Sequence, residues 1–112
     1  MSRLTIHVLD TSRGAPAAGL HVTLHRLEAD QWAEVARGVT DADGRIPGFV
    51  PSGTAIPVGT YRIRFETGPY LIRHTGSAFY PHVEVVCTLA ADGHYHVPLL
   101  LSPYGYSTYR GS

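Results

Sequence analysis

Hydrophobic and polar residues alternate with a period of two along most of this chain. In five stretches the apolar residues take every second position, which places them on one face of an extended strand. Each stretch predicts a half-buried β-strand, because one face packs on a core while the other meets water. The five apolar stripes are Leu4-Ile6-Val8, Leu20-Val22-Leu24, Tyr61-Ile63-Phe65, Val83-Val85-Cys87-Leu89 and Tyr95-Val97-Leu99-Leu101.

Segments rich in Gly, Pro, Asp and Ser separate these stripes. They fall at 10–16, 41–44, 51–59, 92–93 and 102–105, where they predict turns. Short strands at this spacing favour an all-β fold, a two-sheet antiparallel sandwich. One short helix is expected around 67–74, with Thr67 as its cap, Pro69 in its first turn and Gly76 at its end.

Composition narrows the class of protein. The 112 residues are expected to form one domain, residues 1–112, with the 44% hydrophobic content of a globular protein. Nine basic and nine acidic residues cancel, so neither nucleic acid nor an anionic membrane is an expected partner. All nine basic residues are arginine, which excludes Schiff-base and P-loop mechanisms because both need a lysine amine.

The cysteine content and the lack of targeting or membrane segments bear on the expected location of the protein. A lone cysteine, Cys87, excludes an internal disulfide, and its apolar stripe predicts a packed, inert thiol. Strand-like sequence begins at Leu4, so no secretory signal is expected, and no apolar run is long enough to span a membrane. The cytoplasm is therefore the expected location.

Histidines supply the first candidate chemistry. His7 lies on the face of its strand opposite the apolar stripe, and His94 and His96 share the outward face of theirs. Any one of them alone is typical of solvated surface. Together they could hold a zinc ion, but His-x-His spacing on a strand is weak evidence, so no metal or other cofactor is expected.

The segment 41–45 has two interpretations. Asp41-x-Asp43-Gly44 resembles the start of a calcium loop, but Arg45 and Ser52 stand where further oxygen ligands are required, so calcium is rejected. A tight turn is the simpler interpretation. It projects Arg45 from its edge, where a guanidinium can grip a planar carbonyl or carboxylate group.

The end of the chain is unusual. Chain ends are commonly polar, mobile and dispensable, whereas this one carries an aromatic ring, a guanidinium and a carboxylate on Ser112, which indicates part of a site. Gly105-x-Ser107 begins like the nucleophile elbow of a serine hydrolase. Tyr109 stands where the closing glycine belongs, so that class is not expected.

Taken together, several segments resemble the transthyretin-related 5-hydroxyisourate hydrolases, a family of enzymes of urate breakdown. The resemblance covers essentially the whole chain, and the terminal tetrapeptide is highly specific to that family. It implies an eight-stranded transthyretin-like sandwich with one short helix, assembled as a homotetramer, a dimer of dimers joined by edge strands. The matching segments are His7 to Asp10, Asp43 to Arg45, Gly59 to Arg62, Phe79 to Pro81, His94 to Pro103 and Tyr109 to Ser112.

The resemblance also implies a reaction: water opens the six-membered ring of 5-hydroxyisourate without a cofactor. Two imidazoles would hold and deprotonate the water, an arginine would stabilise the developing charge, and which histidine takes the proton stays open. His94 is expected only to flank the site. The implied catalytic residues are His7, Arg45, His96 and Ser112, and the implied substrate-binding residues are His7, Arg45, Tyr109, Arg110 and Gly111.

Two other functions stay open at this point. A transthyretin-type carrier would hold an aromatic hormone in a central channel of the same fold, but the carriers lack this polar constellation. A purely structural sandwich would not need three regions of the chain to converge on imidazole, guanidinium and a chain end. The fold alone does not distinguish these functions, so the residues of the site must distinguish them.

Overall fold

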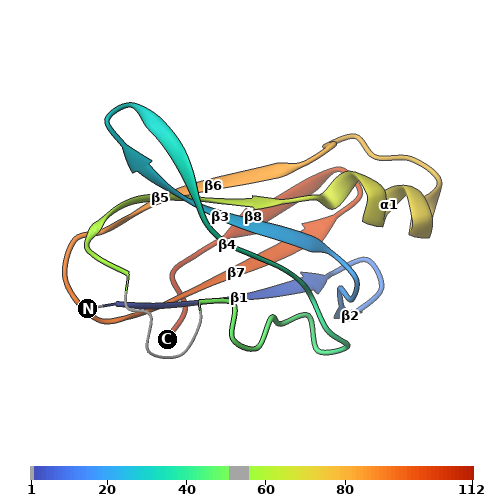
Figure 1. Ribbon diagram of the computed structural model, residues 1–112. Coiled ribbons are helices and arrows are strands. Elements are labelled where there is room, and N and C mark those ends of the chain that lie inside the picture. The colour runs from blue at the N-terminus through green and yellow to red at the C-terminus, as the bar shows by residue number, and fades with distance from the viewer. Residues whose placement is uncertain (1, 51–55) are drawn as a thin grey trace.

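Two four-stranded sheets face each other in the computed structural model, which describes residues 2–50 and 56–112 (Figure 1). One sheet has the strand order β2-β1-β7-β8 and the other β4-β3-β5-β6. The predicted sandwich with one short helix is therefore confirmed over these residues. The elements are β1 (Arg3–Asp10), β2 (Ala15–Pro16), β3 (His21–Glu28), β4 (Gln31–Val39), β5 (Gly59–Phe65), α1 (Thr67–Thr75), β6 (Val83–Leu89), β7 (His94–Ser102) and β8 (Gly105–Thr108).

The pairing of β1 with β7 departs from the antiparallel expectation. These two strands run parallel, with Thr5 opposite His96 and His7 opposite Pro98, whereas the other strand pairs are antiparallel. A parallel pair requires a long connection, and nearly the whole chain lies between these two strands. The parallel register brings residues from the two ends of the sequence onto one face of one sheet.

The core lies between the two sheets. The apolar stripes of β1, β3, β5 and β7 point inward and are almost completely buried. In β6, an edge strand, Val85 and Cys87 are only partly covered, because no neighbouring strand lies beyond them among the described residues. The largest fully buried side chains are Tyr61, Tyr70, Phe65, Leu4, Ile6, Leu20, Leu24, Ile63, Leu71, Leu89, Leu99 and Leu101.

The helix begins differently from the prediction. Glu66 occupies the position before the first turn, and the hydroxyl of Thr67 donates to the carbonyl of Tyr80 instead of capping the helix. The predicted Thr67 cap is therefore wrong, because the hydroxyl is used to hold the segment after the helix. The predicted end is correct: Gly76 has the left-handed φ of 88°, and its N–H donates to the carbonyl of Ile72.

A buried polar cluster fixes α1 to the end of β1. The Tyr70 hydroxyl donates to the Asp10 carboxylate at 2.7 Å, and Arg13 donates to the Tyr70 oxygen at 3.1 Å. The other Asp10 oxygen accepts from Ser12 and from the backbone of Arg13. Burial on its own would raise the pKa of Asp10, but these hydrogen bonds hold the pKa below its ordinary value of 3.8.

Three strands were not predicted from the residue pattern: β2, β4 and β8. β2 lies inside the segment 10–16, which was predicted as a turn, and pairs with the end of β1. β4 follows β3 through a two-residue turn at Ala29 and Asp30, whose φ values are 48° and 67°. β8 follows the predicted turn at 102–105 and pairs back onto β7. The turn predicted at 51–59 lies partly outside the described residues.

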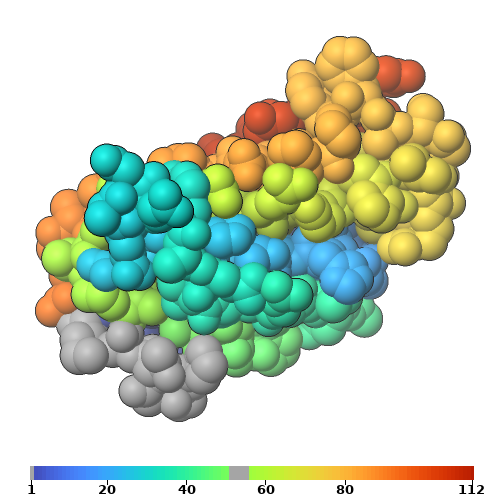
Figure 2. Space-filling model, turned by 45° about the horizontal axis from the view of Figure 1, so that its top comes forward, coloured from blue at the N-terminus to red at the C-terminus, as the bar shows by residue number. Residues whose placement is uncertain are grey.

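Aromatic rings gather at the end of the molecule where α1 lies. The Phe79 ring is 4.9 Å from that of Tyr80 and 6.1 Å from that of Tyr104, so the segment after α1 meets the turn between β7 and β8. Figure 2 shows this end with α1 in yellow, the segment after it in orange and the β7–β8 turn in red. Among the described residues, no helix has the length and apolar character needed to cross a bilayer.

Candidate active site

Two imidazoles face each other on the outer side of the β2-β1-β7-β8 sheet. His7 comes from β1 and His96 from β7, and their ring centroids are 6.4 Å apart with planes tilted by 35°. Both side chains are partly buried. The parallel pairing of β1 with β7 brings them together, because outward residues of neighbouring strands lie side by side.

The proton position on His7 follows from its partner. The Nε2 atom lies 2.9 Å from the carbonyl oxygen of Asp43. Since a carbonyl oxygen can only accept, Nε2 carries the hydrogen and donates it. Nδ1 is then the basic nitrogen of the neutral His7 ring.

A turn presents Arg45 beside these imidazoles. The Asp41 carboxylate accepts hydrogen bonds from the backbone N–H groups of Asp43 and Arg45, at 2.9 and 3.1 Å. The carboxylate is therefore used inside the turn, as the tight-turn interpretation requires. Arg45 is exposed and follows directly from this fixed backbone.

The same turn is docked against β1. The N–H of Val8 donates to the carbonyl of Gly44 at 2.8 Å. The backbones of His7 and Arg45 form an isolated antiparallel β-bridge. Gly44 has a left-handed φ of 75°, and a Cβ added there would lie 2.3 Å from the Val8 carbonyl oxygen. Glycine is required for this close approach. It sets Arg45 next to His7.

Thr5 joins two histidines and was missed by the sequence analysis. Its hydroxyl oxygen lies 2.8 Å from Nδ1 of His96 and 3.2 Å from Nε2 of His94. The only available signal was its place two residues before His7, on the same face of β1. Without the parallel register, nothing in the sequence connects it to the His-x-His segment.

The end of the chain reaches the site by continuing the register of β8. The N–H of Gly111 donates to the carbonyl of His96 at 2.7 Å, which forms an isolated bridge beyond the last regular pair of β7 and β8. Ser112 is the next residue. The tail thus covers His96 from the side opposite Thr5.

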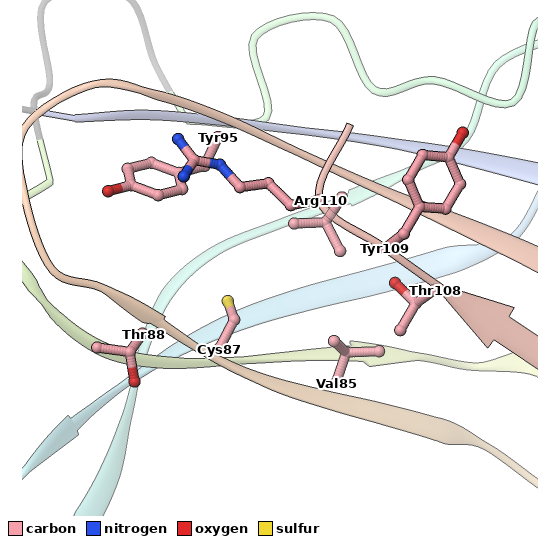
Figure 3. Close-up of a pocket in the computed structure, with 8 residues that line it drawn as sticks. Val85, Cys87, Thr88, Tyr95, Thr108, Tyr109 and Arg110 are labelled. Atoms are coloured by element: carbon pink, nitrogen blue, oxygen red, sulfur yellow. The ribbon is translucent and has the colours of Figure 1, made fainter. Parts of the chain in front are cut away.

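The side chain of Arg110 lies elsewhere. Its guanidinium stacks 4.3 Å from the ring centre of Tyr95, as Figure 3 shows. Tyr95 faces inward from β7, whereas the neighbouring His96 lies on the opposite face of that strand. The side chain of Tyr109 is 56% exposed. Of the predicted site residues, His7, Arg45, His96 and Gly111 are therefore close together, and the Arg110 side chain is not with them.

A cavity of about 280 Å³ lies between β6 and the tail, separate from the imidazoles. Figure 3 shows the Cys87 sulfur directed into it from β6. Burial raises the pKa of that thiol, which agrees with an unreactive cysteine. The lining residues are Val85, Cys87, Thr88, Tyr95, Val97, Thr108, Tyr109 and Arg110.

Electrostatics make His96 suited to accept a proton. Burial lowers the pKa of its imidazole below the ordinary 6.5, and the electrostatic influence of Arg45, and after it of His7 and His94, lowers it further. The ring is then neutral at pH 7. A neutral imidazole can act as a general base.

The three histidines weighed as zinc ligands have other partners. His94 and His96 share the Thr5 hydroxyl, and His7 bonds the Asp43 carbonyl. Within residues 2–50 and 56–112, no three His, Cys, Asp or Glu side chains are placed so that they could hold a metal ion.

Comparisons of the sequence with known proteins agree with the family resemblance that the sequence motifs indicated. The sequence model of the HIUase/Transthyretin family matches residues 4–111. A 5-hydroxyisourate hydrolase of Mus musculus is 49% identical, with 99% of this chain and 96% of that protein covered.

Solved structures agree on the fold. The 5-hydroxyisourate hydrolase of Klebsiella pneumoniae has a TM-score of 0.85 and 38% identity, with all of both chains covered. A transthyretin of Sparus aurata has a TM-score of 0.90 and 33% identity, with 99% of this chain and 97% of that chain covered. This chain belongs to the HIUase/transthyretin family.

Proposed function

We propose that this protein hydrolyses 5-hydroxyisourate to 2-oxo-4-hydroxy-4-carboxy-5-ureidoimidazoline. The observation that carries the proposal is the convergence of His7, Arg45 and His96 on one outer sheet face. Close relatives over nearly the full chain are named for this activity, which supports the same assignment. The cytoplasmic location stays a prediction.

The two imidazoles are proposed to hold the attacking water. With ring centroids 6.4 Å apart, a water can sit between them at ordinary hydrogen-bond distances of about 2.8 Å. We assign the base role to His96, whose Nδ1 is engaged by Thr5 and whose Nε2 is left to face the water. His7 would position that water through Nδ1, since its Nε2–H is given to Asp43.

Arg45 is proposed to stabilise the oxyanion. When water attacks a ring carbonyl, negative charge builds on its oxygen, and a guanidinium fixed by a turn can meet it without reorganising. The Asp41 turn supplies that fixed backbone. No cofactor is needed in this scheme.

The tail is proposed to complete the site. Gly111 lies against His96, and Ser112 would orient substrate or imidazole through hydrogen bonds. Tyr109, Arg110 and Gly111 are proposed to bind substrate. Because the Arg110 guanidinium is stacked on Tyr95, we expect Arg110 to contribute through its backbone.

Assembly into a homotetramer is part of the proposal. β6 and β8 form sheet edges, and exposed side chains lie on both, Val86 at 58% and Tyr106 at 44% exposure. Strand edges of this kind pair readily with a second copy, which would extend each sheet across a dimer. Light scattering of the purified protein tests this: four chains are expected, and a stable monomer with full activity would contradict it.

The activity is tested with fresh substrate. Urate oxidase converts urate to 5-hydroxyisourate, whose ultraviolet absorbance decays slowly by itself. Added protein is expected to accelerate the decay in proportion to its concentration. A solved sea bream transthyretin holds thyroxine, an aromatic hormone. Decay at the spontaneous rate, together with tight binding of thyroxine, would instead favour the alternative of a transthyretin-type carrier.

A further inference from the structure

One hydroxyl group connects the proposed base to the protein surface. Thr5 Oγ1 lies 2.8 Å from Nδ1 of the partly buried His96 and 3.2 Å from Nε2 of the exposed His94. The two histidines are two residues apart on β7, and Thr5 faces them from β1. The three groups form a continuous line from the candidate site to solvent.

Hydrogen-bond chemistry gives this line a direction. A hydroxyl has one hydrogen, so Thr5 donates to one imidazole while it accepts from the other. When it donates to His94, His96 carries its hydrogen on Nδ1 and presents a bare Nε2, which is a base. When it donates to His96, the neutral His96 ring carries its hydrogen on Nε2 and is an acid.

The proposed reaction leaves a proton to be removed. Water adds to the ring carbonyl carbon, the C–N bond breaks, and the leaving nitrogen takes one of the two protons of the water. The carboxylic acid so formed is ionised at neutral pH, and each turnover therefore releases one proton. The Gly111 backbone lies against His96, so the tail narrows direct access of buffer to that ring.

We propose that Thr5 and His94 form a proton relay that exchanges the proton on His96 with solvent. A proton accepted at Nε2 of His96 releases the Nδ1 proton to Thr5, and the Thr5 proton passes to Nε2 of His94. His94 then gives its Nδ1 proton to water. When the leaving nitrogen takes the Nε2 proton of His96, the transfers run in reverse, His94 takes a proton from water, and the starting positions of the hydrogens are restored. Thr5 and His94 act through His96, so they are positioning residues rather than catalytic ones.

Burial of His96 and its position near the Arg45 guanidinium support this relay. Burial lowers the pKa of His96, and so do Arg45, His7 and His94. A ring of this kind holds a proton weakly and passes it on readily. His94 is exposed, which suits it to deliver the proton to water.

Buffer dependence tests the relay, which rests on the proposed hydrolase activity. The turnover number kcat of Thr5→Val and of His94→Asn is measured with fresh 5-hydroxyisourate at low buffer concentration and with increasing imidazole. Both variants are expected to lose about tenfold in kcat at low buffer, the rate equivalent of one lost hydrogen bond to a charged group. Imidazole is expected to restore kcat, because a small buffer replaces the relay.

Matched variants separate the relay from a structural role. Thr5→Ser keeps the hydroxyl and is expected to retain wild-type kcat without added imidazole. Thr23→Val makes the same chemical change on the outer face of β3, and His21→Asn removes an exposed histidine at the start of that strand. Both are expected to behave as wild type at every imidazole concentration.

The outcomes distinguish the relay from the hydrolase proposal itself. Wild-type protein that fails to accelerate the decay of 5-hydroxyisourate overturns the hydrolase function. Active wild type with Thr5→Val and His94→Asn unaffected, or slowed equally at all imidazole concentrations, overturns the relay alone. Slowing that imidazole reverses in both variants, with Thr5→Ser normal, supports it.

Discussion

Gly111 lies so close to His96 that no side chain fits between them. A Cβ added to Gly111 would stand 2.7 Å from Cδ2 of the His96 ring, and the Gly111 N–H donates to the His96 carbonyl at 2.7 Å. Strand register rather than a flexible end sets this contact, because Gly111 continues the pairing of β8 along β7. The tail thereby fixes one side of the proposed base.

Gly111→Ala is expected to lower kcat about tenfold or more while the protein stays folded. The added methyl group must push aside the imidazole or the tail, and small displacements of a catalytic group are costly. Steady-state kinetics with fresh 5-hydroxyisourate measures the effect. Gly105→Ala is the matched control, since its Cβ meets its nearest atom at 3.6 Å. Equal kinetics for the two variants would remove the Gly111 contact from the account.

His96→Asn is expected to lower kcat by roughly 10²–10⁴-fold, the usual contribution of a general base. Asparagine can still bond to Thr5 but cannot accept a proton at pH 7. Circular dichroism and light scattering check that fold and assembly are kept. Near-normal turnover in a folded variant would remove His96 from the mechanism.

Arg45→Lys is expected to lower kcat/KM by roughly 10–100-fold, although the positive charge is kept. A lysine ammonium cannot make the paired, planar contact of a guanidinium, and one charged hydrogen bond is worth about 1.5–3 kcal/mol. Arg37, which forms an exposed ion pair with Glu34 on the other sheet, supplies the control. Arg37→Lys makes the same chemical change away from the site. Matching losses in both variants would contradict a specific role for Arg45.

The pH profile of kcat/KM follows from the lowered pKa of His96. Its neutral form is the active one, so activity is expected to fall as pH drops through a pKa below the ordinary 6.5. Arg45→Gln removes the guanidinium charge, which contributes to lowering this pKa. The acid limb of that variant is expected to move to higher pH. An acid limb above pH 6.5 in the wild type is the result that would oppose the assignment.

Tyr70→Phe is expected to reduce the free energy of unfolding by about 1.5–3 kcal/mol at pH 7, because a buried carboxylate loses a donor. The folded pKa of Asp10 lies below its unfolded value near 3.8, so its stabilisation is present above that pH. It is lost as pH falls through the folded pKa. Urea unfolding measures the free energy of unfolding of the wild type and of Tyr70→Phe at pH 7 and at pH 3. The difference between the two proteins is expected to be smaller at pH 3. Tyr104→Phe, which alters a highly exposed ring, serves as the control.

Much of the fold could be predicted because one face of each central strand is buried. The alternation at Leu4, Ile6 and Val8 reflects a sheet packed on one side only, and such a pattern is visible in any single sequence. β4 was not predicted, because its side chains are only partly buried and its hairpin turn uses Ala29 and Asp30. Both adopt positive φ, a conformation usually signalled by Gly or Asn.

The site could be predicted only in part. His7 and His96 stood out because an imidazole facing away from an apolar stripe is available for chemistry. Thr5 did not, since its importance depends on the parallel register of β1 and β7, which is a long-range property. The stacking of Arg110 on Tyr95 was equally invisible, because it depends on which way the tail turns after β8.

The location of a bound purine analogue tests the central claim most directly. In a crystal structure with a non-hydrolysable analogue of 5-hydroxyisourate, we expect the ring on the outer face of the β2-β1-β7-β8 sheet. It should lie within hydrogen-bond distance of the Arg45 guanidinium, with a water between its carbonyl carbon and His96. An analogue seated instead in the cavity between β6 and the tail, with both imidazoles contacting only solvent, would contradict the account.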